Sequence, residues 1–146
     1  MTSQRRQQFL AGERPDDVHI FVSTDAVSDP DRLADTNHGE KVRDGVVLVL
    51  DGERGRAAFE SAVGIDPMAL ARDAMGTEGE VHESCTDATC PNAGDGDTHS
   101  PRFTFAFAEE QSADAGGLYA EGDVIHCYVA CACGLNYSDK WVAGGD

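Results

Sequence analysis

The stretch VVLVL at residues 46–50 decides how this chain folds. It is a continuous apolar run, bounded by Gly45 before it and by Asp51 and Gly52 after it. Neighbouring side chains of a β-strand point to opposite faces of the sheet, so an unbroken apolar run predicts a strand that is buried on both faces. We therefore expect this strand to lie in the interior of its sheet.

Before this run, residues 18–22 (VHIFV) predict a first strand, because they are rich in β-branched and aromatic side chains and follow a Pro-Asp-Asp turn. Residues 28–44 are rich in Asp and Asn, and we expect them to form a polar loop. Near the start of the chain, a short amphipathic helix is expected between Ser3, as its N-cap, and Gly12, just past its end.

After the run, the sequence predicts two helices. The first covers residues 56–63 and ends at Gly64, and the second covers residues 67–75 with Asp66 as its N-cap. One face of the second helix carries apolar residues at helical spacing, which predicts that this face packs on the core. The residues of this face are Met68, Leu70, Ala71, Ala74 and Met75.

The second half of the chain has the pattern of β-structure. In residues 103–108, Phe alternates with Thr or Ala, which is the period of a strand with one aromatic face. Gly122 permits a tight hairpin turn before a long strand at residues 124–131. Residues 137–142, which include Trp141, are expected to add an edge strand.

Together these elements predict an α+β fold. Its first half, residues 1–78, would combine strands with the two helices, and its second half, residues 79–146, would be an antiparallel hairpin region with a zinc-ribbon-like cysteine clamp. A chain of 146 residues has about the length of one domain. We therefore expect both halves to pack as a single domain over residues 1–146.

The chain is strongly acidic, with 27 Asp and Glu against 11 Lys and Arg and a formal net charge of −16. This balance does not favour nucleic acid as a partner, because phosphate neutralisation needs clustered basic residues. The two lysines, Lys41 and Lys140, are few beside 17 Asp, which is typical of a halophilic protein. In about 1 M salt the Debye length falls to about 3 Å, so surface carboxylates scarcely repel one another.

Nothing in the sequence favours a membrane as partner, since no apolar run approaches the roughly 18 residues that a spanning helix needs. The start of the chain, with Arg5 and Arg6, resembles a twin-arginine export signal, but no apolar signal core follows it. We therefore expect a cytoplasmic protein, in which a framework of disulfides is not favoured.

The five cysteines include two close pairs, Cys85 with Cys90 and Cys131 with Cys133, separated by forty residues. A structural zinc ion needs four N or S ligands in a tetrahedron, and paired ligands on two loops meet that requirement. We expect these four cysteines to bind structural zinc. Buried reduced cysteines, which behave as small hydrophobic side chains, and redox-active thiols are the alternatives.

Three other residues near these pairs are open alternatives as ligands. Cys127 stands about 13 Å from Cys131 along an extended strand, so the two should not share an ion. His82 precedes Cys85 by three residues, and His126 adjoins Cys127. By strand alternation His126 points away from Cys127, so we expect it at the surface or near the site without binding the ion.

The segment from Cys85 to Gly134 resembles a zinc ribbon, whose two cysteine knuckles hold one metal ion at the end of a small sheet. Ordinary ribbon knuckles place two residues between their cysteines, whereas here four and one residues intervene. This spacing departs from the ribbon pattern in both knuckles.

Other segments, at residues 9–17, 66–68, 74–79 and 118–123, make the chain similar to a small haloarchaeal family of unknown function. This resemblance implies a cytoplasmic protein of a salt-loving archaeon and implies no activity.

No nucleophile, triad order or paired catalytic carboxylate is recognisable in the sequence, so a non-enzyme is favoured. We expect a zinc-stabilised interaction module with a protein partner, and a thiol-dependent redox protein is the alternative. The sequence does not indicate a small-molecule ligand.

Overall fold

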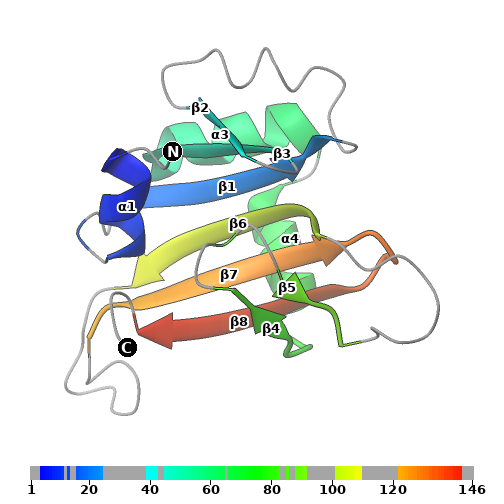
Figure 1. Cartoon of the computed structure of the whole chain (residues 1–146). Helices are drawn as coiled ribbons and strands as arrows, with labels where there is room; N and C mark the ends of the chain where they lie inside the picture. Colours follow the sequence, from blue (N-terminus) through cyan, green and yellow to red (C-terminus); the bar gives the residue numbers. More distant parts are fainter. Residues whose placement is uncertain are drawn as a thin grey trace.

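The computed structural model of the chain describes residues 4–11, 13, 16–24, 39–42, 45–64, 66–82, 85, 88–91, 101–109 and 122–142. Its main feature is a six-stranded sheet in which all neighbouring strands are antiparallel (Figure 1). The strands are ordered across the sheet as β2 (Gly39–Val42), β3 (Gly45–Asp51), β1 (Asp17–Ser23), β6 (Pro101–Glu109), β7 (Val124–Cys131) and β8 (Asn136–Val142).

The strand expected at residues 46–50 is confirmed as β3, which lies between β2 and β1 and is buried from Gly45 to Leu50. The strand expected at residues 18–22 is confirmed as β1, which is buried from Asp17 to Val22. Both strands are covered on both faces, as their unbroken apolar runs require. The expectation of an uninterrupted loop over residues 28–44 is wrong, because Gly39–Val42 forms β2 by backbone pairing with β3.

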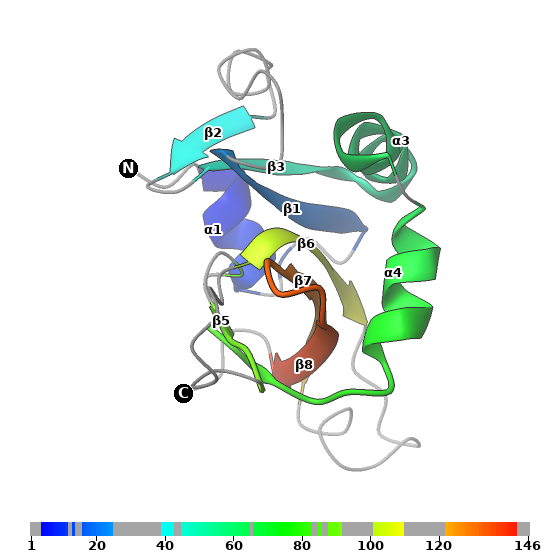
Figure 2. The same cartoon turned by 90° about the vertical axis from the view of Figure 1, so that its right-hand side faces the viewer.

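Two helices, α3 (Gly52–Val63) and α4 (Pro67–Ala74), cover one face of the sheet (Figure 2). Helix α3 begins at Gly52 and not at Arg56, because the Asp51 carboxylate accepts a hydrogen bond from the Arg54 N–H at 3.2 Å and caps the helix there. The expected end of this helix at Gly64 is confirmed, with Gly64 in the left-handed conformation at φ 79°.

The start of α4 is also confirmed, since Asp66 caps the helix by accepting a hydrogen bond from the Met68 N–H at 2.9 Å. The expected core face of this helix is confirmed for Leu70, Ala71 and Ala74, but it is wrong for the methionines, because Met68 is 47% exposed and Met75, just after the helix, is 66% exposed. The buried face of this helix consists of Pro67, Leu70, Ala71 and Ala74.

The opposite face of the sheet is covered by helix α1 (Gln4–Leu10) and by a two-stranded ribbon of β4 (Glu80–Val81) and β5 (Ala88–Thr89) (Figure 2). Phe9 of α1 is fully buried and stacks on His19 of β1 with ring centroids 5.7 Å apart. The caps expected for this helix, Ser3 and Gly12, lie outside the described residues.

In the second half of the chain, the expected strands are confirmed as β6, β7 and β8, with β8 at the edge of the sheet. The hairpin expected at Gly122 involves residues 118–121, which lie outside the described part. The described residues therefore form a mixed α and β structure in which an antiparallel sheet dominates and strands from both halves of the chain are neighbours. None of the described helices has the length and apolar content needed to cross a membrane.

Candidate metal centre

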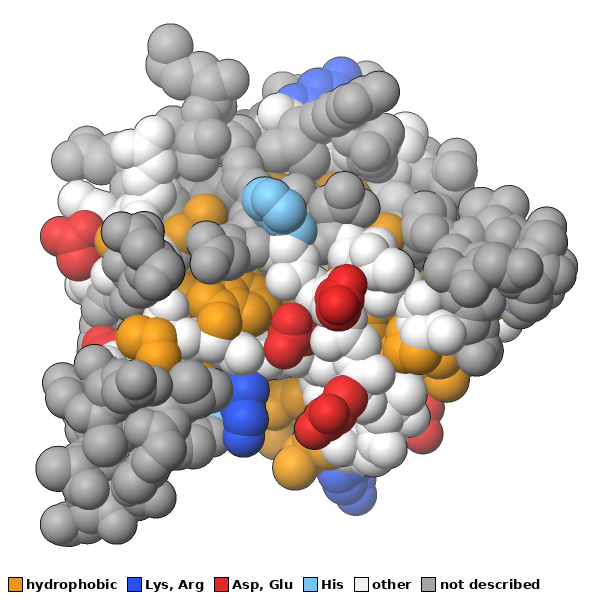
Figure 3. Space-filling model, turned by 60° about the horizontal axis from the view of Figure 1, so that its bottom comes forward, with side chains coloured by type: hydrophobic (Ala, Val, Ile, Leu, Met, Phe, Trp, Pro, Cys, Tyr) orange, Lys and Arg blue, Asp and Glu red, His pale blue; other side chains and the backbone are white. Residues whose placement is uncertain are grey.

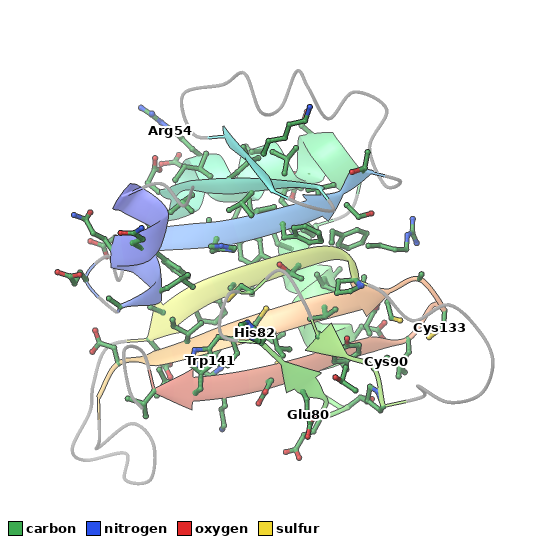
Figure 4. The ribbon with its side chains drawn as sticks, viewed as in Figure 1. Arg54, Glu80, His82, Cys90, Cys133 and Trp141 are labelled. Carbon is green, nitrogen blue, oxygen red and sulfur yellow. The ribbon has the colours of Figure 1, made fainter. Side chains whose placement is uncertain are left out.

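Three cysteines meet at the end of the sheet where β7 turns into β8. Cys90 directly follows β5, Cys131 is the last residue of β7, and Cys133 lies in the turn (Figure 4). The turn is closed by a hydrogen bond from the Gly134 N–H to the Cys131 carbonyl at 2.9 Å, with Gly134 at φ 98°. A side chain rarely adopts this backbone angle, so glycine after Cys133 allows the chain to reverse here.

The spacing of the three sulfur atoms matches the requirement of a tetrahedral metal ion. All three Sγ atoms lie within 4.8 Å of one another, and those of Cys90 and Cys133 are 3.8 Å apart. Zinc binds thiolate sulfur at about 2.3 Å, which places two sulfurs of a tetrahedron about 3.8 Å apart. These three cysteines, which we call the tri-cysteine site, could therefore hold one ion without a large movement of the backbone.

Burial affects the protonation of the tri-cysteine site. Cys90 and Cys131 are buried and Cys133 is half-buried. Burial, together with hydrogen bonds to the thiols of Cys133 and Cys90, raises the pKa of the Cys131 thiol to about 11, against the opposing effect of a hydrogen bond from the Cys133 backbone. Thiols with a high pKa stay protonated near neutral pH, so a metal ion that binds here must displace protons, and its affinity should fall as the pH falls.

Cys85, the fourth residue of the expected zinc clamp, does not belong to the tri-cysteine site. Its side chain forms a hydrogen bond with Cys127, and both thiols are fully buried under the ribbon. This hydrogen bond and burial raise the pKa of the Cys127 thiol well above its usual value of 9.0. The five cysteines therefore divide into the tri-cysteine site and a separate buried pair.

The local backbone explains why Cys85 and Cys90 separate. Cys85 has a left-handed backbone with φ 62°, and its carbonyl accepts a hydrogen bond from the Thr104 hydroxyl at 3.0 Å, which fixes it over β6. Strand β5 then carries the chain from this point toward the end of the sheet, where Cys90 meets Cys133. A spacing of four residues does not reveal this change of direction.

The two histidines considered as ligands also lie outside the tri-cysteine site. His82 is exposed, and Figure 4 shows it away from Cys90 and Cys133. His126 lies near the other end of β7, where its Nε2 atom is 3.4 Å from a carboxylate oxygen of Glu109 and its ring stacks on Phe107 at 5.1 Å. Among the described residues, no fourth His, Cys, Asp or Glu joins the three cysteines.

The fold and the site define an α+β protein with a dominant antiparallel sheet and a cysteine group that is able to hold a metal ion. The chain belongs to a family of unknown function, DUF5807, whose sequence model matches residues 39–144. This match confirms the expectation of a family without a known function, and it contains all five cysteines. No curated protein and no solved structure matches the chain.

The resemblance to a zinc ribbon is not confirmed. In a zinc ribbon the strands that carry the ligands form a small sheet of their own, whereas here β7 is the fifth strand of a six-stranded sheet. Only the ribbon of β4 and β5, which leads to Cys90, is a separate small sheet.

Proposed function

We propose that this chain is a non-enzymatic interaction module of the cytoplasm of a halophile, with a structural zinc ion held by Cys90, Cys131 and Cys133. The observation that carries the proposal is the separation of 3.8 Å between the sulfurs of Cys90 and Cys133, with the Cys131 sulfur within 4.8 Å of both. Soft thiolate ligands in a tetrahedral arrangement select zinc over hard cations such as Mg²⁺. A water molecule or a donor outside the described residues would complete the tetrahedron.

The ion would attach the ribbon of β4 and β5 to the main sheet. Each strand of this ribbon has two residues, and an isolated hairpin of this size is marginal in water. At its other end the ribbon is held by Asp139, whose carboxylate accepts a hydrogen bond from the Val81 N–H at 3.1 Å. A metal ion at Cys90 would hold the end that leads toward β6.

The main sheet has a substantial core on each face that does not depend on this ion. One core lies under α3 and α4 and includes Phe59, Phe103 and Phe105, and the other lies under α1 and the ribbon. We therefore expect loss of the ion to loosen the ribbon and leave the sheet folded. This differs from small zinc fingers, which unfold entirely without metal.

A protein partner fits the charge of the chain better than nucleic acid does, because a net charge of −16 repels phosphates. A thiol-dependent redox role is less well supported. The reactive form of cysteine is the thiolate, and burial together with neighbouring thiols raises the pKa of both Cys131 and Cys127.

The test is metal analysis of the full chain in molar KCl. We expect about one zinc per chain, and Co²⁺ substitution should give the sulfur-to-metal charge-transfer absorption of thiolate ligands. Cys133→Ser should abolish metal binding while the far-UV circular dichroism stays unchanged, because Cys133 is half-buried in a turn. The matched control is Cys85→Ala, which should keep the metal.

Hydrogen exchange tests the structural role of the ion. Removing zinc should speed exchange at Val81, whose N–H pairs with Asp139, and leave the amides of β1 and β3 protected. In vivo cross-linking should recover protein partners with the wild-type chain and fewer with Cys133→Ser. A chain that binds no metal and forms a reversible disulfide would instead establish the redox alternative.

A further inference from the structure

A hollow of about 440 Å³ lies on the helix-covered side of the sheet, where α4 ends beside β7 and β8. This volume is in the range of sites that bind small molecules. Figure 3 shows the edge of the molecule around β8, where acidic, basic and hydrophobic side chains lie close together. The side chains that matter for the hollow are Met75, Glu78, His126, Tyr128, Ser138 and Lys140.

The strand register arranges these side chains in two rows. His126 pairs with Lys140, Tyr128 pairs with Ser138, and Ser138 also bridges to Glu78. Directly opposed residues of a sheet have their Cβ atoms about 5 Å apart, and diagonal neighbours about 7–8 Å. Tyr128 and Glu78 therefore lie on either side of Ser138, and Lys140 lies in the next row, two residues along β8, which makes it a diagonal neighbour of Glu78.

The other carboxylates around the hollow already have partners. Both oxygens of Asp139 accept backbone hydrogen bonds, from Lys140 at 2.8 Å and from Val81 at 3.1 Å. Glu109 pairs with the His126 ring at 3.4 Å. The carboxylate of Glu78 is exposed and has no hydrogen-bond or ion-pair partner among the described residues.

The charge of the whole chain restricts what this hollow can select. A net charge of −16 repels a simple anion, and a simple cation is attracted to carboxylates over the entire surface. A small zwitterion adds no net charge, and it can engage one lysine and one glutamate together. The Tyr128 ring and the flexible thioether of Met75 offer apolar contact to a side chain of such a ligand.

We propose that this hollow binds a small zwitterion of the α-amino-acid class. Its carboxylate contacts Lys140 and the Ser138 hydroxyl, and its ammonium group contacts Glu78. To bind such a ligand, the lysine nitrogen and the glutamate oxygen must lie about 8–9 Å apart, which is the length of two charge-assisted hydrogen bonds plus that of the ligand between them. These two flexible side chains can adopt that separation. The site is separate from the tri-cysteine site, because His126 lies five residues, about 16 Å, along β7 from Cys131.

The test uses L-phenylalanine, 3-phenylpropanoate and phenethylamine as probes of the full chain, with binding followed by isothermal titration and by NMR shifts. Of the two analogues, 3-phenylpropanoate lacks only the ammonium group and phenethylamine lacks only the carboxylate. We expect saturable binding of phenylalanine and at least tenfold weaker binding of each analogue. Lys140→Gln and Glu78→Gln should each weaken phenylalanine binding at least fivefold.

The matched control is Lys41→Gln, which removes the other lysine, on β2 at the far edge of the sheet. This variant should leave the affinity for phenylalanine unchanged. Cys133→Ser should also leave it unchanged, because that substitution affects only the metal centre. The inference is overturned if phenylalanine shows no saturation up to about 10 mM. It is also overturned if 3-phenylpropanoate binds as tightly as phenylalanine, or if Lys41→Gln weakens binding as much as Lys140→Gln.

Discussion

Helix α3 packs against Val18 of strand β1 at Gly55, and replacing this glycine tests the packing of the helix layer. A Cβ atom at Gly55 would lie 2.1 Å from Cγ2 of Val18 and 3.7 Å from Cδ2 of Leu50. Carbon atoms in contact are normally about 3.5–4.0 Å apart. In Gly55→Ala, either Val18 must change its rotamer or α3 must move away from the sheet.

Two opposing effects decide the magnitude. Alanine is favoured over glycine within a helix by up to about 1 kcal/mol. Overpacking a well-filled core by one methyl group usually costs about 1–3 kcal/mol. Because Val18 is buried in the core between α3 and the sheet, we expect the overpacking to win and the free energy of unfolding to fall by about 1–2 kcal/mol.

Urea unfolding in molar KCl, followed by far-UV circular dichroism, measures this change. The control is Gly76→Ala, because a Cβ there meets nothing within 4 Å, and its effect should stay below about 0.5 kcal/mol. In the double variant Gly55→Ala with Val18→Ala, the new methyl occupies space that the valine vacated. The double variant should then lose at least about 1 kcal/mol less stability than the sum of the losses in the two single variants. Stabilisation by Gly55→Ala, or strict additivity in the double variant, would refute the reasoning.

Three further predictions concern the ribbon, the buried thiols and the surface. Gly79→Ala should destabilise by about 1–3 kcal/mol in urea unfolding, because the added Cβ would lie 2.3 Å from the buried Tyr137 ring; an unchanged midpoint would show that the ring can move. The hydrogen bond with Cys85 and burial raise the pKa of Cys127 above 9.0, so this thiol keeps its proton longer when folded than when unfolded. Stability of the metal-free chain should therefore be full below about pH 9 and fall above it, with a shallower fall in Cys127→Ala; identical pH profiles would contradict this. The melting temperature should drop steeply when KCl is diluted to about 0.1 M, because the net charge of −16 is then poorly screened, and a melting temperature indifferent to KCl would exclude this reading of the surface.

The parts of the fold that sequence patterns predicted are those in which one segment carries its own signal. The run at residues 46–50 identified β3, and Asp66 before Pro67 marked the start of α4. Strand β2, with the sequence GEKV, has no apolar signal and exists because the edge of β3 offers backbone partners. Met68 of α4 and Met75 just after it are exposed, whereas Leu70, Ala71 and Ala74 are buried, because the packing of the helix on the sheet selects one apolar face and helical spacing alone does not.

The sequence by itself determined the apolar strands, the N-cap of α4 and the presence of cysteines near residues 85–90 and 131–133. Only the tertiary structure decided which thiols meet: Cys90 with Cys131 and Cys133, and Cys85 with Cys127. The physical reason is that strand periodicity sets the face on which a side chain lies but not its neighbours from distant segments. Those neighbours depend on strand register and on the path of the ribbon across the sheet, which are set by packing of the whole chain.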